Sequence, residues 1–95
     1  MLNTLKHDNY VVELKKKISH KYDSVSSHVY FNISKKSKGE IDLFARKGDK
    51  IDLYEVKCSH RITKARKQLQ RARKHIGHKG DSYFYCGSSG LLQLI

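Results

Sequence analysis

Three carboxylates interrupt two short runs of the sequence that otherwise read as buried strands. Asp42 lies in the run 41–45, and Asp52 and Glu55 lie in the run 51–56. A buried charge without a partner destabilises a fold, so proteins rarely keep one without a use for it. Carboxylates that converge on one point can hold a divalent cation, because Mg²⁺ takes one or two carboxylates together with water and phosphate oxygens. Whether these acids converge depends on how the two runs pair.

The Gly-Asp pair at residues 48–49 is typical of a two-residue hairpin turn between two strands. With that turn, Lys47 pairs with Lys50, and Asp42 directly faces Glu55. Facing residues have Cβ atoms about 4.5–5.5 Å apart, where like charges repel. We therefore predict a divalent cation between the two acids. Alternatively, a longer turn changes the register, and the acids pair with nearby lysines or alternate along a solvated strand face.

Strand periodicity also places a lysine beside this pair of acids. Because side chains alternate across a strand, Lys57 shares a face with Glu55, and Asp42 lies on that face in the predicted register. Glu40 would face Lys57, either as a structural ion pair or as a group that tunes the lysine. Asp52 points to the opposite face, and we expect it to be a surface residue.

The strand aspartate, the run Glu-Val-Lys at residues 55–57 and the basic amphipathic helix that follows resemble the PD-(D/E)xK nuclease superfamily. The arrangement is most similar to archaeal Holliday junction resolvases and their viral relatives. The sequence pattern GEIDL…EVK is also similar to that of an uncharacterised bacterial family of the same fold. The resemblance covers roughly residues 10–76, and Ile41 replaces the family proline, which is a common variation. It implies a restriction-endonuclease-like α/β core, with a mixed central sheet flanked by helices.

The resemblance also implies roles for individual residues. Asp42 and Glu55 match the acidic metal ligands, and the backbone carbonyl of Val56 would complete the protein's contribution to the metal. Lys57 matches the catalytic lysine, which positions the attacking water and offsets charge on the phosphate. The implied cofactor is Mg²⁺, for which Mn²⁺ can substitute. The implied reaction is hydrolysis of DNA phosphodiester bonds.

Two further roles follow less directly from the resemblance. The family's resolvases bring a glutamate from the first helix, where Glu13 is the only glutamate and Asp8 is the alternative acid. Some branches carry a glutamine and, one turn later, a tyrosine on the second helix. Here Gln68 is followed by Ala72, so the pair is absent, although Gln68 lies near the apolar face of that helix. Gln68 and Glu40 are therefore candidates to contact the catalytic residues without binding the metal themselves.

The elements that must position these residues follow from periodicity and turn residues. Asn3 or Thr4 is the expected cap of a first helix that ends near Ser19. The remaining elements are strands and one amphipathic helix, separated by a basic flexible turn at 34–39 and a break at 77–81. Their predicted bounds are 24–33, 40–46 and 51–57 for three strands, 61–76 for the second helix, 82–86 for a fourth strand and 91–95 for a possible fifth.

Charge is the strongest signal in the composition. The chain has 95 residues and a net charge of +11, which favours a polyanionic partner, with nucleic acid ahead of a membrane surface. A merely solvated basic surface is the alternative. Backbone contacts of this kind do not read sequence, so we expect structure-selective or nonspecific cleavage. The candidate DNA contacts are Lys35, Lys36 and Lys38 before Asp42, and Lys64, Lys67, Arg71 and Lys74 on the second helix.

Two other functions remain open at the level of sequence. One is a DNA-binding module of the same fold with little or no cleavage, against which the intact set of Asp42, Glu55 and Lys57 argues. The other is an RNA-directed or ribosome-associated basic protein in which the acids are structural. Cleavage of plasmid, branched DNA and RNA side by side would separate the three.

The chain is expected to form one domain, residues 1–95, in the cytoplasm of a prokaryote or of a virus-infected host cell. No apolar run approaches the roughly 20 residues of a membrane span, and residues 1–10 lack the apolar stretch of a signal peptide. We expect reduced thiols at Cys58 and Cys86, because neither lies in a metal or redox motif. His75 and His78 are expected to complement a helix dipole rather than bind metal.

A homodimer is expected for two reasons. A Holliday junction has two strands to cut, and a small monomer offers one site. In addition, the uncharged tail with Leu91, Leu92, Leu94 and Ile95 would be protected by pairing with a second copy. The alternative is that the tail closes the sheet of its own monomer.

Overall fold

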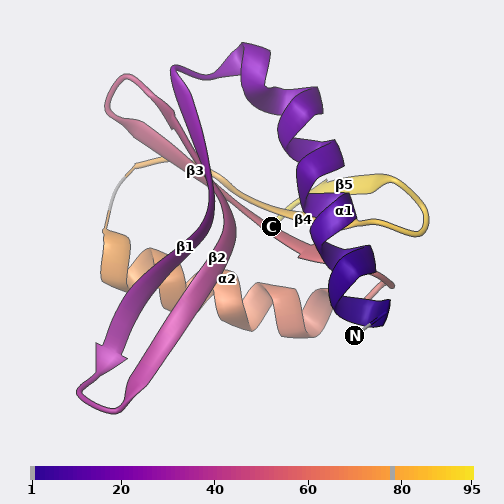
Figure 1. Cartoon of the computed structure of the whole chain (residues 1–95). Helices are drawn as coiled ribbons and strands as arrows, with labels where there is room; N and C mark the ends of the chain where they lie inside the picture. Colours follow the sequence, from indigo (N-terminus) through magenta and orange to yellow (C-terminus); the bar gives the residue numbers. More distant parts are fainter. Residues whose placement is uncertain (1, 78) are drawn as a thin grey trace.

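The computed structural model describes residues 2–77 and 79–95, and the side chains of residues 2–4 are outside this description. The element order is α-β-β-β-α-β-β, as the sequence predicts, in an α/β fold with two helices and a five-stranded sheet (Figure 1). The elements are α1 (Leu2–Ile18), a short 3₁₀ turn (Ser19–Lys21), β1 (Ser24–Ser34), β2 (Ser37–Lys47), β3 (Lys50–Lys57), α2 (Ile62–Ile76), β4 (Ser82–Cys86) and β5 (Leu91–Leu94).

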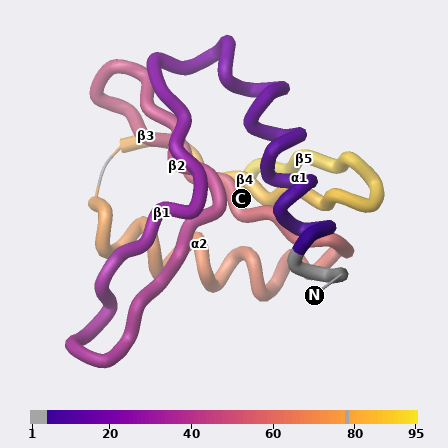
Figure 2. Tube along the Cα trace, in the orientation of Figure 1, coloured from indigo at the N-terminus to yellow at the C-terminus, as the bar shows by residue number. Residues whose placement is uncertain are grey.

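The sheet is mixed, with the strands in chain order β1-β2-β3-β4-β5. β3 and β4 run parallel and are joined through α2, whereas the other neighbouring pairs are antiparallel. β5 pairs with β4, so the uncharged tail does close the sheet of its own chain, as the alternative prediction has it. The trace in Figure 2 shows the long β1–β2 hairpin projecting away from the rest of the sheet.

Each helix covers one face of the sheet, because each presents an apolar stripe at helical spacing. The α1 stripe predicted from Val11, Leu14 and Ile18 is buried against Leu43, Ala45, Tyr54, Val56 and Tyr85. The α2 stripe of Ala65, Leu69 and Ala72 is buried against a second set, which consists of Ile41, Ile51, Leu53, Phe84 and Cys86. Two separate layers of core therefore hold the central strands between the helices.

The β1–β2 hairpin is longer than predicted. The expected flexible turn at 34–39 is wrong in extent, because Ser37, Lys38 and Gly39 belong to β2. The ring of Phe31 lies over Gly39, its partner in the ladder, so closely that a Cβ atom at Gly39 would collide with it. Aromatic cover of a strand glycine restores the packing that glycine lacks, which extends the pairing toward the tip.

The ends of the helices also differ slightly from expectation. α1 begins at Leu2, so Asn3 and Thr4 lie inside the helix rather than at its cap. α2 ends at Gly77, whose φ of +65° suits the left-handed position that closes a helix. His75 packs its ring against Phe31, with ring centroids 5.6 Å apart, and His78 lies outside the described residues.

Two sequence expectations concern features away from the site. Cys58 and Cys86 are both free thiols. Within residues 2–77 and 79–95, neither helix is long and apolar enough to cross a membrane.

Candidate metal centre

The β2–β3 hairpin has the predicted register. Its two-residue turn leads into a ladder that runs from Lys47↔Lys50 to Leu43↔Tyr54. The next pair, Asp42 with Glu55, is absent from the ladder. There the Asp42 carboxylate takes the place of a backbone acceptor, because the N–H of Val56 donates to Asp42 Oδ2 over 2.8 Å. The two strands therefore separate at the position where the sequence places the two acids.

Both acids are buried at this opening. Asp42 is 3% exposed and Glu55 is 2% exposed. Glu55 Oε2 lies 3.6 Å from Lys57 Nζ, but Glu55 Oε1 has no hydrogen-bond partner among the residues that the structure describes. Burial, and after it the nearby Asp42 carboxylate, raises the pKa of Glu55 to about 9, although the Lys57 charge opposes this shift. The surroundings of the pair therefore disfavour two ionised carboxylates side by side.

A histidine that the sequence analysis missed completes the surroundings of Asp42. His7 Nε2 lies 2.9 Å from the carbonyl oxygen of Val56 and 3.3 Å from Asp42 Oδ2, so a protonated Nε2 donates to both acceptors. In Figure 1 the N-terminal end of α1 lies beside the end of β3, which brings this residue to the site. The sequence does contain a signal for it. His7 is four residues before Val11, so it continues the buried stripe of the first helix.

These groups fit a small divalent cation. An octahedral Mg²⁺ has bonds of about 2.1 Å, which puts neighbouring ligand atoms about 3 Å apart. The separations of 2.9 Å and 3.3 Å from His7 Nε2 to Val56 O and Asp42 Oδ2 are close to that value. Glu55 Oε1 has no hydrogen-bond partner among the described residues and is a further candidate ligand, although the described group whose ligand atoms all lie within 4.8 Å of one another consists of His28, Glu40 and Asp42. The carboxylate and carbonyl donors suit Mg²⁺ or Mn²⁺, and the imidazole shifts the preference toward a transition ion such as Mn²⁺.

The helix glutamate does not reach this point. Glu13 Oε1 lies 3.3 Å from Lys17 Nζ and accepts from the Tyr85 hydroxyl over 3.3 Å. Glu13 is six residues beyond His7, or about 9 Å along the helix axis. The α1 residue that contacts Asp42 is His7, so the expectation that Glu13 is brought to the two strand acids is not met.

Asp8, the alternative acid on the first helix, does lie beside the centre. Its Oδ1 is 3.7 Å from His7 Nδ1, on the far side of the ring from the nitrogen that faces Asp42. A carboxylate behind a histidine of a metal site fixes the orientation and tautomer of the ring. Asp8 therefore occupies a supporting position for His7.

Glu40 does not face Lys57, because the ladder ends before that pair. Its carboxylate instead lies 3.5 Å from His28 Nδ1 on β1. Gln68 of α2 lines a hollow of about 260 Å³ together with Glu40 and Arg71. Among the described residues, the buried side-chain oxygens without a hydrogen-bond partner are Gln68 Oε1 and Glu55 Oε1. Both belong to residues that the sequence analysis selected, and unsatisfied buried groups are rare in folded proteins.

Asp52 is not the simple surface residue that was expected. It accepts from the Tyr22 hydroxyl over 2.6 Å and from the N–H of Asp81 over 2.8 Å. The same tyrosine hydroxyl lies 2.6 Å from the hydroxyl of Tyr54. Asp52 therefore joins the start of β1 to the loop before β4.

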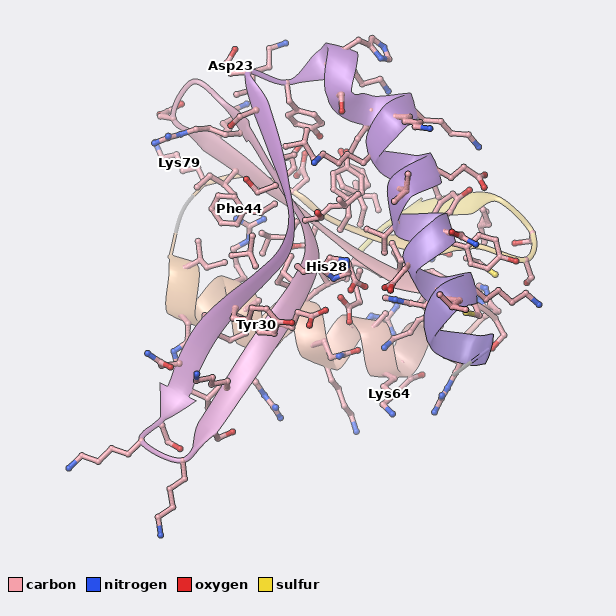
Figure 3. All side chains as sticks on the ribbon, in the orientation of Figure 1. Asp23, His28, Tyr30, Phe44, Lys64 and Lys79 are labelled. Atoms are coloured by element: carbon pink, nitrogen blue, oxygen red, sulfur yellow. The ribbon has the colours of Figure 1, made fainter. Side chains whose placement is uncertain are left out.

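The seven predicted DNA contacts are all exposed and form two groups, one at the tip of the β1–β2 hairpin and one on the outer arc of α2. Figure 3 shows nitrogen-tipped side chains projecting from the hairpin tip and from α2, where Lys64 is labelled. Lys38 and Arg71, one from each group, line the same hollow as Glu40. The two basic groups therefore meet beside the acidic centre.

Comparison with known proteins leaves this centre to be interpreted from its own geometry: no protein-family model matches the chain, and no curated protein is significantly similar to it in sequence.

Proposed function

We propose that this chain is a metal-dependent endonuclease with a restriction-endonuclease-like core of the PD-(D/E)xK type, which hydrolyses phosphodiester bonds of DNA. The observation that carries the proposal is the buried pair of Asp42 and Glu55 beside Lys57, with an unpartnered Glu55 oxygen, where β2 and β3 separate. A purely structural role would give both carboxylates partners. The order α-β-β-β-α-β-β supports the proposal, because the superfamily resemblance implies the same order.

Asp42, Glu55, the carbonyl of Val56 and His7 are the groups that would hold Mg²⁺ or Mn²⁺. When bound, such an ion acts as a Lewis acid on the phosphate and lowers the pKa of bound water. His7 would serve in its neutral form, with Nδ1 protonated and directed to Asp8. Asp42 is already held in place, because the N–H of Val56 donates to it.

Lys57 supplies a fixed positive charge to the reaction. Its side chain is 17% exposed, and its ammonium group is held 3.6 Å from Glu55 Oε2. A cation placed in advance where the phosphate gathers negative charge stabilises the transition state without reorganisation. Lys57 would therefore act on the rate of the chemical step more than on substrate affinity.

The two basic groups would hold the DNA backbone across the acidic centre. The candidates are Lys35, Lys36, Lys38, Lys64, Lys67, Arg71 and Lys74, all exposed. Contacts to phosphates fix position and orientation but carry no sequence information. The expected substrate is therefore DNA of a particular shape, such as a branched junction, or DNA of any sequence.

A second copy of the chain would complete an enzyme that cuts two strands. Within residues 2–77 and 79–95 the outer edge of β5 is unpaired, and Leu91, Leu92 and Leu94 are 43%, 41% and 59% exposed. This strand contains no charge, although the chain carries a net +11, so two copies can approach here without local repulsion. We propose that two β5 strands pair to form a homodimer.

The deciding experiment measures cleavage of plasmid, a four-way DNA junction and RNA in Mg²⁺. It compares the wild type with Glu55→Gln and with Asp49→Asn, a matched loss of one carboxylate at the exposed turn of the same hairpin. Cleavage of DNA by the wild type and Asp49→Asn, and none by Glu55→Gln, is the expected result. DNA binding without cleavage would identify a non-catalytic module, and selective action on RNA would identify an RNA-directed protein.

A further inference from the structure

A second group of possible ligands, from β1 and β2, includes Asp42. His28 of β1 and Glu40 and Asp42 of β2 each offer a ligand atom, and these atoms all lie within 4.8 Å of one another. His28 Nδ1 is 3.5 Å from Glu40 Oε1, and its other ring nitrogen, Nε2, is 3.9 Å from Asp8 Oδ1. Both nitrogens of this imidazole therefore face carboxylates. In Figure 3 the His28 ring lies between β1 and α1.

The backbone of β1 is distorted at this histidine. His28 lies opposite Asp42, between the pairs Ser27↔Leu43 and Val29↔Ile41, but the two do not form a ladder pair. Its φ is +54°. In the described part of the chain, His28 is the only non-glycine residue with a positive φ. This conformation is unfavourable for a non-glycine residue, and strain of this kind concentrates at functional sites. The strand is distorted where its histidine meets the acids.

The charges around His28 are unbalanced in favour of carboxylates. Three of the nine acids of the chain, Asp8, Glu40 and Asp42, lie near His28, and Glu55 lies near Asp42. Among the described residues, Lys57 is the only lysine or arginine with its charged group within 4.0 Å of a carboxylate oxygen of these four acids. The acid that it contacts is Glu55. The chain has 20 lysines and arginines, yet among the described residues the ion-pair partners of the remaining three acids are histidines.

There is also room for an ion with its water. His7, Asp8, His28, Tyr30 and Glu40 line an open hollow of about 420 Å³. Ligands of a first-row divalent ion lie about 3 Å apart when adjacent and about 4.2 Å apart when opposite, so three ligand atoms within 4.8 Å of one another reach one ion by adjustment of their side chains.

We propose that His28, Glu40 and Asp42 form a second divalent-cation site, which shares Asp42 with the first and, because it contains an imidazole, favours Mn²⁺ or a similar transition ion over Mg²⁺. The inference extends the proposed function, since the two sites share a ligand. Binding of the ion does not require that the protein cleave DNA.

The test is a titration of the metal-free protein with Mn²⁺, followed by the loss of the electron paramagnetic resonance signal of free Mn²⁺. The wild type should bind two ions per chain. Glu40→Gln should weaken one of them by roughly tenfold or more, and Glu55→Gln should weaken the other. Asp42→Asn should weaken both, because it is shared. His28→Asn is a second variant for the new site, since asparagine tolerates positive φ and keeps the backbone conformation.

Matched controls use groups with no part in either site. His20→Ala removes an exposed histidine after α1, and Asp49→Asn removes an exposed carboxylate from the β2–β3 turn; both should bind two ions. A wild type that binds one ion, with an affinity sensitive to Glu55→Gln but not to Glu40→Gln or His28→Asn, overturns the inference and leaves the proposed function intact. Binding of two ions, both with affinities that Glu55→Gln leaves unchanged, would instead contradict the proposed function.

Discussion

Asp52 and Glu55 are carboxylates on the same strand, three residues apart, and their surroundings are opposite. Asp52 is satisfied, because it accepts from the Tyr22 hydroxyl and from the N–H of Asp81, and nearby Arg73 donates to the carbonyl of Asp81. Glu55 has one oxygen near Lys57 and one oxygen with no partner. The first arrangement is that of a structural link between distant segments. The second leaves a buried carboxyl oxygen available to a ligand.

The largest expected effect is on catalysis. Glu55→Gln should reduce the rate of DNA cleavage in Mg²⁺ by at least about a thousandfold, since a metal contributes several kcal/mol to the transition state. DNA binding should remain, because the basic surface is unchanged. Asp52→Asn, a change of the same chemistry on the same strand, should keep most of the activity. Single-turnover cleavage assays and a gel-shift assay check both, and equal activity of the two variants would remove the distinction drawn between these acids.

A somewhat smaller effect is expected for the lysine that contacts Glu55. Lys57→Ala should lower kcat by about a hundredfold to a thousandfold, because the lost charge acts mainly in the transition state. Metal binding should be retained, since Lys57 is not a ligand. Kinetics at saturating DNA, with Mn²⁺ binding measured in parallel, separate the two. A variant that bound DNA poorly but turned over at the normal rate once saturated would show that Lys57 serves binding instead.

The contrast between Glu55 and Asp52 also predicts that substitutions of these two acids have opposite effects on the stability of the metal-free protein. The pKa of Glu55 is raised to about 9, above the ordinary value of 4.5 that it regains on unfolding. Between these values the folded state holds a proton that the unfolded state releases, so the free energy of unfolding of the metal-free protein falls as pH rises from 4.5 to 9. Glu55→Gln removes this loss and should raise the Tm near pH 8 by about 5 °C or more, with little change near pH 4.5.

Asp52→Ala should do the reverse, because it leaves a tyrosine hydroxyl and a backbone N–H without their acceptor. Its cost of about 1–3 kcal/mol should lower the Tm at pH 6 and at pH 8 alike. Thermal melts in a chelator measure both variants. Destabilisation of the metal-free protein by Glu55→Gln at pH 8 would mean that this carboxylate is a structural link as well.

The smallest expected effect is on dimerisation through β5, which depends on unpaired backbone N–H and C=O groups rather than on side chains. The outer edge of β5 is unpaired in the chain, and a second copy would satisfy it. Light scattering should give twice the chain mass of 11.0 kDa at micromolar concentration. Leu92→Lys should weaken association by roughly tenfold or more, whereas Leu5→Lys, at a leucine of α1 that is 63% exposed, should not. A monomer throughout a dilution series would rule out the dimer.

Much of the fold could be predicted because its signals are local. The apolar stripe of the second helix and the residues of the two-residue turn lie within short windows of sequence. The turn alone determined the β2–β3 register, and hence which strand residues lie nearest to Asp42 and Glu55. The length of the β1–β2 hairpin was underestimated, since the ring of Phe31 that covers Gly39 acts across the ladder.

The sequence by itself determined the β2–β3 register from Lys47↔Lys50 to Leu43↔Tyr54, because periodicity and turn chemistry act over a few neighbouring residues. Only the tertiary structure decided that His7 rather than Glu13 reaches Asp42, since this depends on where α1 crosses the sheet. The same is true of Asp52, whose partners Tyr22 and Asp81 are about 30 residues away on either side. It also decided that His28 turns toward Glu40 and Asp42, because a single left-handed backbone residue redirects a side chain that strand alternation cannot predict.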